Sequence, residues 1–317
     1  MPLGLTMLGN RKRDFFILLV VVVLLMILPL VVGEFYLYVV RLICIYTILT
    51  IGLNIFMGYC GQINFGASGF FCIGAYIPTI LQMKLGWHYL VAFPVGVITS
   101  LFVGWVVSWP LLRLRSHAMA IGTMALAMPI YLVFERFEKI TGGSDGTVVP
   151  PTIFFGSTMG NLFYYYSILV FTAVVFLIAY FLADSRIGRA LKAVRDNQDA
   201  AEAIGVDANH YRRLAWLVNV LLAGIAGGLY AQQAAYISPV TFSLGSNILM
   251  LVMLCVGGQG TILGPVVGAI IMTSIPYILI SIQHYALLVQ GLILFAVLRF
   301  MPAGIVGTIA KRFARVA

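Results

Sequence analysis

Long, unbroken runs of apolar residues constrain this chain more than any other feature of its sequence. One of them, FFILLVVVVLLMILPLVV at residues 15–32, contains no charged residue. A helix needs about 20 such residues, at ~1.5 Å each, to cross the ~30 Å hydrocarbon core of a bilayer. Only 9% of the 317 residues are charged, whereas soluble domains carry roughly 25%. The chain is therefore expected in a membrane, and because its runs are continuous rather than alternating, they predict helices and not a barrel of strands.

The hydropathy pattern predicts an all-α, polytopic membrane protein in which residues 1–317 form one transmembrane domain of about ten helices. We interpret the first run as a membrane helix and not as a signal peptide, because it is too long and no A-x-A site follows it. The segment at 246–258 is short for a full span, and GGQGTILGP follows it, so it and the next segment are candidates for a broken or re-entrant element. The ten segments are 15–33, 36–57, 62–82, 89–112, 117–134, 163–183, 214–234, 246–258, 262–282 and 285–300.

The basic residues indicate how these segments are oriented, since cytoplasmic loops carry an excess of Lys and Arg. With the N-terminus inside, fifteen of the nineteen basic residues fall on the cytoplasmic side, and both termini are cytoplasmic. The net charge of +9 follows from this topology and from contact with anionic lipid, and it gives no support for nucleic-acid binding. The cytoplasmic set is Arg11, Lys12, Arg13, Arg113, Arg115, the six basic residues of 186–213, Arg299, Lys311, Arg312 and Arg315; the outer set is Arg41, Lys84, Arg136 and Lys139.

One stretch, SRIGRALKAVRDNQDAAEAIG at residues 185–205, is highly charged in the middle of this apolar chain. Each Arg, Lys or Asp at the centre of a membrane helix costs about 2.5–3.5 kcal/mol, so its seven charges together would cost about 20 kcal/mol in lipid. The stretch must therefore lie in water or against a protein, and we assign residues 185–213 to a cytoplasmic insert. The seven charged residues are Arg186, Arg189, Lys192, Arg195, Asp196, Asp199 and Glu202.

The same stretch has the pattern of one amphipathic helix. Asp184 or Ser185 can accept hydrogen bonds from the free N–H groups of the first turn, and Gly205 sits where a helix needs a left-handed terminating residue. Such a helix either rests on lipid or docks a cytosolic protein; its acidic second half weakens the first alternative, because anionic headgroups would repel it. The apolar stripe, at three- or four-residue intervals, is Ile187, Leu191, Val194, Ala201 and Ile204.

Several motifs resemble those of a known family. DAAEAIG, residues 199–205, resembles the E-A-A-x-x-x-G element of ABC importer permeases, although Asp199 replaces Glu and the I-x-L-P tail is missing. A wider set of stretches resembles, in order, the permease of branched-chain amino-acid ABC importers, and this chain looks like the longer of the two permeases in such a system. The stretches are GYCGQINFGASGFFCIGAY (58–76), ITGGSDG (140–146), SRIGRALKAVRDNQDAAEAIGV (185–206), LAGIAGGLYA (222–231), GGQGTILGPVVGA (257–269) and LRFMPAGIVG (298–307).

The resemblance implies a conduit in the bacterial inner membrane and not an enzyme. It implies three kinds of partner besides lipid: a second related permease, two cytosolic ATP-binding subunits and a periplasmic substrate-binding protein. ATP and Mg²⁺ would bind the ATP-binding subunits, so neither a cofactor, a metal nor a catalytic residue is expected here. Closure of those subunits would pull on the charged helix and turn the membrane cavity inward. The ATPase-coupling residues implied by the resemblance are Arg189, Arg195, Asp199, Ala200, Ala201, Glu202 and Gly205.

A glycine-rich stretch, GYCGQINFGASGF at residues 58–70, combines small residues with the polar side chains of Gln62, Asn64 and Ser68. A polar side chain at membrane depth needs a partner or a watery cavity, so one interpretation is that these three line the translocation pathway. The other is close helix packing with interhelical hydrogen bonds, which we favour for most single positions. GGQGTILGPVVGA has a similar Gly–Gln composition, and both stretches fall on the cytoplasmic side of the predicted topology.

Residues 135–161 are expected to form a periplasmic loop, because they are rich in Gly, Pro, Ser and Asp. Their TGGSDG motif lacks the Lys-Ser/Thr of a phosphate-binding loop, so we interpret it as a turn where the binding protein docks. Glu135, Glu138 and Asp145 would be rim charges there, which serve encounter more than affinity.

Three alternatives stay open. A secondary transporter usually keeps a carboxylate or a histidine inside the membrane, but here every Asp and Glu falls in a predicted loop or at a helix end. A membrane prenyltransferase would need Mg²⁺ on spaced acidic residues; Asp196, Asp199 and Glu202 would share a helix face, yet the chain offers no second acidic cluster. Within the family, relatives that carry urea or short amides leave the substrate open.

Overall fold

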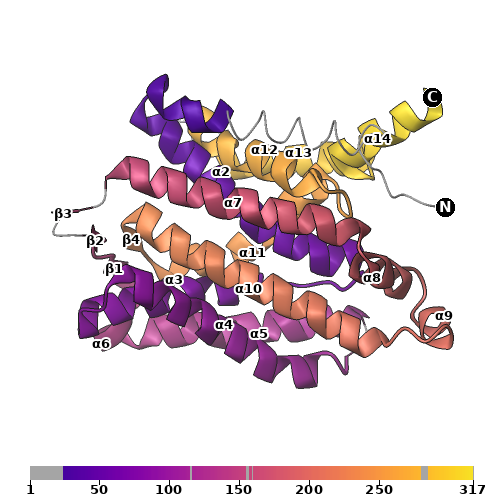
Figure 1. Cartoon of the computed structure of the whole chain (residues 1–317), viewed down its shortest axis with the longest axis horizontal. Helices are drawn as coiled ribbons and strands as arrows, with labels where there is room; N and C mark the ends of the chain where they lie inside the picture. Colours follow the sequence, from indigo (N-terminus) through magenta and orange to yellow (C-terminus); the bar gives the residue numbers. More distant parts are fainter. Residues whose placement is uncertain (1–23, 115, 155–156, 159, 280–284, 317) are drawn as a thin grey trace.

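The apolar runs form long helices that lie side by side in a bundle (Figure 1). A computed structural model describes residues 24–114, 116–154, 157–158, 160–279 and 285–316 of the chain. The longer helices are α2 (Glu34–Leu53), which continues as the π-helical segment η3 (Asn54–Tyr59), α3 (Ala67–Leu85), α4 (Tyr89–Leu111), α5 (Ser116–Arg136), α7 (Asn161–Asp184), α8 (Arg186–Asp196), α10 (Ala208–Ala234), α11 (Leu244–Gly257), α12 (Gly264–Ile278), α13 (Ala286–Phe300) and α14 (Gly304–Val316).

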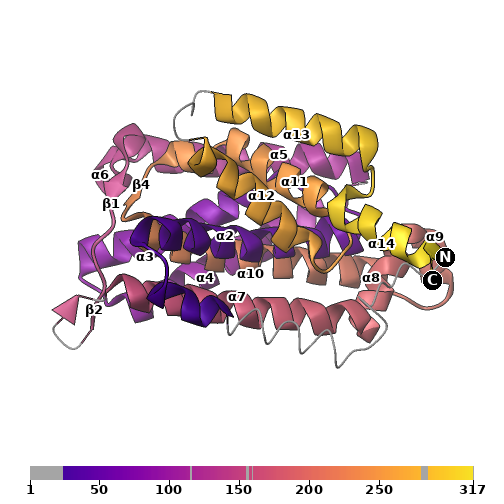
Figure 2. The same ribbon diagram turned by 90° about the horizontal axis from the view of Figure 1, so that it is seen from above.

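Short elements gather at the two ends of the bundle. One end holds α6 (Glu138–Thr141), η4 (Gly143–Asp145) and four two-residue strands, and the other holds α8, α9 (Gln198–Ala203) and α14 (Figures 1 and 2). Strand β1 (Thr147–Val148) pairs antiparallel with β4 (Tyr236–Ile237), and β2 (Ile153–Phe154) pairs with β3 (Ser157–Thr158). The remaining short helices are η2 (Leu28–Leu30) and η5 (Pro239–Phe242). The charged insert and the loop after α5 therefore lie at opposite ends, as the predicted topology requires.

Six of the described helices are long and apolar enough to span a membrane, so the structure does not confirm the predicted ten. They are Glu34–Tyr59, Tyr89–Leu111, Ala118–Arg136, Asn161–Asp184, Ala208–Ala234 and Leu287–Arg312. Residues 15–23 of the first predicted segment, 15–33, lie outside the described residues. The all-α membrane architecture is confirmed.

The predicted helix at 62–82 begins later than expected. Residues 60–66 are irregular and α3 starts at Ala67, because Gly61 takes a left-handed conformation (φ +73°) and interrupts the helix. The Oδ1 atom of Asn64 then accepts a hydrogen bond from the N–H of Gly66 at 2.7 Å. Such local bonding by Asn offers the backbone an alternative to the helix.

The apolar segments 246–258 and 262–282 become two short helices. With 14 and 15 residues, α11 and α12 are each about 22 Å long, less than the ~30 Å of a hydrocarbon core. They pack closely, since a Cβ on Gly257 would lie 1.8 Å from the carbonyl oxygen of Gly264 and one on Gly268 would lie 1.8 Å from that of Met253. This hairpin has the form of the broken element that the sequence suggested.

The centre of the bundle is the crossing of α3 and α10. A Cβ on Gly74 of α3 would lie 2.2 Å from the carbonyl oxygen of Gly224 of α10, so only glycine permits this approach. About two turns before Gly224 in α10, the fully buried Trp216 donates from Nε1 to the carbonyl of Gly104 in α4 at 2.9 Å. These contacts fix the elements from which the polar segment 60–66 and the charged insert project.

Candidate functional site

The charged insert forms two helices, α8 and α9, where the sequence predicted one. Asn197 between them is extended (φ −159°, ψ 111°), and its Oδ1 accepts a hydrogen bond from the N–H of Ala200 at 3.0 Å. Because an Asn that caps a new helix competes with continuation of the old one, the single-helix prediction was wrong here. Ser185 is the cap of α8, since its Oγ accepts from the N–H of Gly188 at 3.1 Å.

Gly205 ends α9 as the sequence predicted. Its φ is +86°, and its N–H donates to the carbonyl of Glu202 at 3.0 Å. The N–H of Val206 donates to the carbonyl of Ala201 at 3.0 Å, which completes the paired hydrogen bonds of a Schellman motif. Val206 also packs against the buried cluster of Val194, Ala201 and Ala208. The end of α9 is therefore fixed by both hydrogen bonds and packing.

Most of the predicted apolar stripe is buried, with one exception. Leu191, Val194 and Ala201 are at most 4% exposed, and Ile187 packs against the main core. Ile204 is instead 77% exposed, because it lies past the end of α9 and the break at Asn197 has turned this segment away from the stripe of α8. The stripe prediction was wrong for this residue.

The outer surface of α9 is acidic with one apolar residue beside it. Of the predicted coupling residues, Asp199, Ala200, Glu202 and Gly205 are exposed, whereas Ala201 is buried beneath them. The Oε1 atom of Glu202 accepts a hydrogen bond from Nε2 of Gln198 at 3.0 Å, which orders the acidic side chain on this surface. Together with Ile204, these exposed residues make a small surface that a partner can contact.

Two basic residues of α8 bind the end of the preceding helix. Arg189 donates to the carbonyl of Asp184 at 2.7 Å, and Lys192 donates to the carbonyl of Ala183 at 3.0 Å. The carboxyl end of a helix carries partial negative charge, so both contacts are electrostatically favourable. Burial lowers the pKa of the Lys192 ammonium, and the Asp184 carboxylate partly offsets this by raising it. These residues hold α8 against the end of α7.

Arg195, at the end of α8, contacts two glycine-rich turns. Its Nη1 donates to the carbonyl of Gly58 at 2.5 Å. A Cβ on Gly61 would lie 2.5 Å from Cγ of Arg195, and one on Gly260 would lie 3.0 Å from its Nη1. The arginine side chain therefore occupies space that two glycines, Gly61 and Gly260, leave open. Its contact with the neighbouring Asp196, at 3.7 Å, is an exposed ion pair of little energetic weight.

The two glycine-rich stretches of the sequence meet at Asn54. This residue donates from Nδ2 to the carbonyl of Thr261 and accepts at Oδ1 from the N–H of Gly260, both at 2.8 Å. A Cβ on Gly58 would lie 2.6 Å from the nitrogen of Gly260. The end of η3 and the turn between α11 and α12 are thus tied together next to Arg195.

The three predicted pathway residues are all buried in or beside the irregular segment 60–66. Gln62 accepts at Oε1 from Nη2 of Arg212 at 3.2 Å, while Asn64 bonds locally to Gly66. The Nδ2 atom of Asn64 and the Oγ atom of Ser68 have no hydrogen-bond partner among the described residues. Buried polar groups of this kind need water or a ligand. A hydrogen bond to Arg212 of α10 therefore accounts for Gln62, whereas Asn64 and Ser68 each keep a polar atom without a hydrogen-bond partner among the described residues.

Side chains from other helices hold this irregular segment. Thr123 of α5 accepts at Oγ1 from the N–H of Phe65 at 3.0 Å, and Asn247 of α11 donates from Nδ2 to the carbonyl of Phe65. Thr123 lies seven residues into α5, about 10 Å along that helix. Non-helical backbone at membrane depth is tolerated where protein buries it or where it lines a cavity.

The acidic residues of the insert do not form a metal site. Asp196 belongs to α8 whereas Asp199 and Glu202 belong to α9, so the expectation that they share one helix face was wrong. Within the described part of the chain, no group of three His, Cys, Asp or Glu residues comes together as metal ligands would. This geometry gives the prenyltransferase alternative no support.

The TGGSDG motif forms a turn at the other end of the bundle. Gly142, Gly143 and Gly146 all have positive φ, and the hydroxyl of Tyr236 donates to the carbonyl of Asp145. The Oγ1 atom of Thr147 lies 3.2 Å from Sδ of Met83 at the end of α3. The motif is thus a turn, as predicted, and it contacts β4 through Tyr236.

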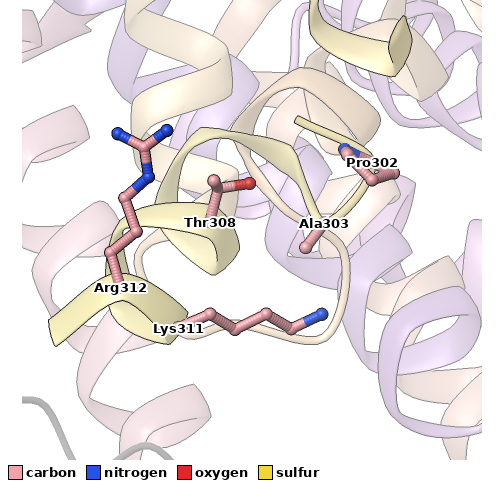
Figure 3. Close-up of a pocket in the computed structure, with 5 residues that line it drawn as sticks. All are labelled: Pro302, Ala303, Thr308, Lys311 and Arg312. Atoms are coloured by element: carbon pink, nitrogen blue, oxygen red, sulfur yellow. The ribbon is translucent and has the colours of Figure 1, made fainter. Parts of the chain in front are cut away.

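A pocket of about 200 Å³ lies where α14 follows α13 (Figure 3). Lys311 and Arg312 reach from α14 in different directions, so no side chains converge on a common point in it. None of the predicted pathway or coupling residues lines this pocket. Its lining residues are Pro302, Ala303, Thr308, Lys311 and Arg312.

Sequence reasoning missed two residues of the site. Asn54 is a lone amide in an apolar run, and a polar residue at membrane depth is a signal of function or of an interhelical bond. Arg212 was counted among loop charges, yet it is 5% exposed and donates both to Gln62 and, at 3.0 Å, to the carbonyl of Leu114. Its position one turn into a helix gave no sign of that burial.

The sequence was compared with known families and proteins. The model of the family described as "Branched-chain amino acid transport system / permease component" matches residues 35–298. LivM of Escherichia coli (strain K12), a high-affinity branched-chain amino acid transport system permease protein, is 25% identical over 303 residues, which cover 87% of this chain and 71% of LivM. LivH of the same strain and system is 26% identical over 285 residues, which cover 83% of this chain and 91% of LivH.

A third relative comes from another transport system. The autoinducer 2 import system permease protein LsrC of Yersinia pseudotuberculosis serotype O:1b (strain IP 31758) is 29% identical over 224 residues, which cover 67% of this chain and 60% of LsrC. No solved structure matches the chain. The relatives favour an ABC permease over an ion-coupled carrier.

Proposed function

The chain belongs to the family of permease components of branched-chain amino-acid transport systems, and on this premise we propose that it forms the translocation pathway of an ATP-driven importer together with a second, related permease. The family match over residues 35–298 carries this proposal. Members of this family are membrane subunits without a catalytic role. ATP and Mg²⁺ would therefore bind to two cytosolic partner subunits and not to this chain.

Branched-chain amino acids are the proposed substrates. LivM and LivH, which are named for them, match over 87% and 83% of this chain, whereas LsrC, named for autoinducer 2, matches over 67%. Urea and short amides are the competing solutes. Because a separate periplasmic binding protein performs most of the selection, binding of leucine, urea and short amides to that partner is the direct measurement. If the binding protein binds leucine but neither urea nor short amides, the assignment is supported. If it binds urea or an amide but not leucine, the assignment is contradicted.

The surface of α9 is the proposed docking site for an ATP-binding subunit. Asp199, Ala200 and Glu202 are exposed at one end of the bundle, and Ile204 stands beside them, 77% exposed. Ile204 thus adds an apolar contact to a surface that is otherwise acidic. The docking cleft would therefore offer an apolar contact for Ile204 and basic groups for the two carboxylates.

This docking sets the orientation of the chain in the bacterial inner membrane. With α8, α9 and the C-terminal helix α14 on the cytoplasmic side, the loop that contains α6, η4 and β1 to β3 faces the periplasm (Figure 1). The periplasmic binding protein would approach that loop. Gln62, Asn64 and Ser68 lie between the two ends, where Asn64 and Ser68 offer unmet hydrogen-bonding groups to water or substrate.

Co-purification tests whether the chain assembles with an ATP-binding subunit, and the energy source of uptake tests whether the importer is driven by ATP or by an ion gradient. Tagged protein from its native membrane is expected to bring down an ATP-binding subunit, and uptake is expected to survive an ionophore but not ATP depletion. Glu202→Arg reverses a charge on the docking surface, and Gly205→Pro is incompatible with a φ of +86°. Both variants should insert yet lose uptake. Absence of the ATP-binding subunit, or uptake that the ionophore abolishes, would refute the assignment.

A further inference from the structure

The side chain of Arg195 joins α8 to two turns that are remote in the sequence. On one side it bonds to the carbonyl of Gly58, 137 residues away, and its stem packs against Gly61. On the other side its Nη1 meets Gly260, where a Cβ would be only 3.0 Å away. Any side chain larger than glycine at Gly61 would displace the arginine or the turn, since the added Cβ would lie 2.5 Å from Cγ and 3.2 Å from Cβ of Arg195.

The other basic residues of α8 make a different kind of contact. Arg189 and Lys192 donate to carbonyls of Asp184 and Ala183, at the end of the helix that directly precedes α8. Those bonds hold α8 to its own neighbour in the sequence. Lys192 also lies over the ring of Tyr59, with its Nζ 5.3 Å from the ring centroid, but among these three residues only Arg195 donates a described hydrogen bond to a turn of the membrane domain.

Both turns lead to the polar segment 60–66. Gly58 and Gly61 precede Gln62 and Asn64 directly, so movement of the first turn moves that segment. The second turn, at Gly260, follows α11, which holds the same segment from the other side through the bond from Asn247 to Phe65. Asn54 ties the two turns to each other through its bonds to Gly260 and Thr261.

We propose that Arg195 is a positioning residue for transport, which transmits a displacement of α8 and α9 to both turns together and so to the segment that carries Gln62 and Asn64. This inference rests on the proposed function, because it requires a motor that moves α9. The Arg195 side chain is 42% exposed, but its stem and its Nη1 contact the two turns closely, and close contacts transmit displacement. Removing the arginine would leave the motor bound and active while the polar segment no longer follows it.

The test uses the importer purified with its ATP-binding subunits and reconstituted in liposomes. It measures leucine uptake, ATP hydrolysis and the amount of bound ATP-binding subunit. Arg195→Met should keep the subunit and the hydrolysis but lower the uptake per ATP by about tenfold. Arg195→Lys, which keeps the charge and a donor, should recover part of the loss. Arg186→Met is the matched control, because Arg186 is exposed in the first turn of the same helix, and its uptake per ATP should stay within about twofold of the parent.

A second variant covers the case in which Arg195→Met fails to insert. Asn54→Ala leaves Arg195 in place and removes only the bonds to Gly260 and Thr261, so it should also lower the uptake per ATP. The proposal is overturned if Arg195→Met stays coupled, if Arg186→Met loses as much, or, where Arg195→Met does not insert, if Asn54→Ala stays coupled. Failure of the parent protein to bind an ATP-binding subunit would overturn the proposed function itself and this inference with it, whereas the other outcomes leave that function standing.

Discussion

Arg212 and Gln62 form a buried hydrogen bond, from Nη2 to Oε1 at 3.2 Å, across 150 residues of sequence. The same guanidinium donates to the carbonyl of Leu114 in the turn that follows α4. The described residues place no carboxylate in hydrogen bond or ion pair with this arginine. One cation therefore joins α10, the turn after α4 and the irregular segment 60–66 through hydrogen bonds to neutral acceptors.

Removal of the Gln62 amide should destabilise the protein. Gln62→Leu leaves a buried guanidinium with one acceptor fewer, which costs about 1–3 kcal/mol, and we expect a lower melting temperature in detergent. Gln62→Glu should keep most of the stability, because a carboxylate accepts the same bond with charge assistance. Gln198→Leu is the control, since that amide bonds to Glu202 at the surface. Equal melting temperatures for Gln62→Leu and the parent would show that this bond does not hold the segment.

The contacts of the basic residues share a physical theme. Arg189, Lys192 and Arg195 each donate to a backbone carbonyl at the carboxyl end of a membrane helix, and Arg212 donates to one just after such an end. Those carbonyls lack helical partners and carry the negative end of the helix dipole. The basic insert therefore closes the ends of membrane helices as well as obeying the rule for cytoplasmic charge.

A charge placed at Ile204 should abolish docking without unfolding the chain. Ile204 is 77% exposed, so Ile204→Asp removes little packing, and we expect an unchanged melting temperature. The variant should retain about tenfold less ATP-binding subunit on co-purification, because one desolvated contact is worth more than ~1.4 kcal/mol at an interface. Val240→Asp is the matched control, since Val240 is 62% exposed in η5, at the other end of the bundle. Equal loss in both variants would argue against α9 as the docking surface.

Local signals predicted much of this molecule. Apolar runs predicted membrane helices, Ser185 predicted the start of α8, and Gly205 predicted the end of α9. Each of these depends on residues within one or two turns, so the sequence displays them directly. The close glycine packing follows from the same kind of information, whereas the start of α3 at Ala67 was not predicted.

The contacts between remote segments and the break between α8 and α9 were not predictable in this way. The bond between Asn54 and Gly260 spans 206 residues, and it depends on how α2 packs beside the hairpin of α11 and α12. The break at Asn197 was missed because the period of the apolar residues continues across it, while the competing side-chain cap is worth only about 1 kcal/mol. The geometry of the site thus depends on small local free energies, such as the Asn197 cap, and on contacts between residues far apart in the sequence. Hydropathy, in contrast, is enough to predict that the chain is a helical membrane protein.

The cap at Asn197 can be tested by hydrogen exchange. Asn197→Ala removes the acceptor for the N–H of Ala200, which costs about 1 kcal/mol, so that amide should exchange about fivefold faster. Asn197→Asp should keep the slow rate, because Asp caps helices as well as Asn does. If the Ala variant exchanges as slowly as the parent, α8 and α9 have merged into one helix or the cap contributes nothing. Uptake by the same variant then shows whether the break itself is needed for docking.

The α3–α10 crossing gives a prediction in which two identical changes have opposite signs. Gly74→Ala would place a Cβ 2.2 Å from the carbonyl oxygen of Gly224. The Cβ is bonded directly to the backbone of α3 and the oxygen belongs to the backbone of α10, so the helices must separate. Such overpacking costs about 1–3 kcal/mol. Gly291→Ala, within α13, meets no atom within 4 Å, so it should gain up to about 1 kcal/mol from helix propensity. Melting temperatures in detergent should fall for the first variant and rise for the second. α3 begins directly after the segment that carries Asn64, and Ser68 lies in its first turn, so separating α3 from α10 should also reduce uptake. A Gly74→Ala variant with unchanged melting temperature and uptake would show that the two helices do not approach this closely in the membrane.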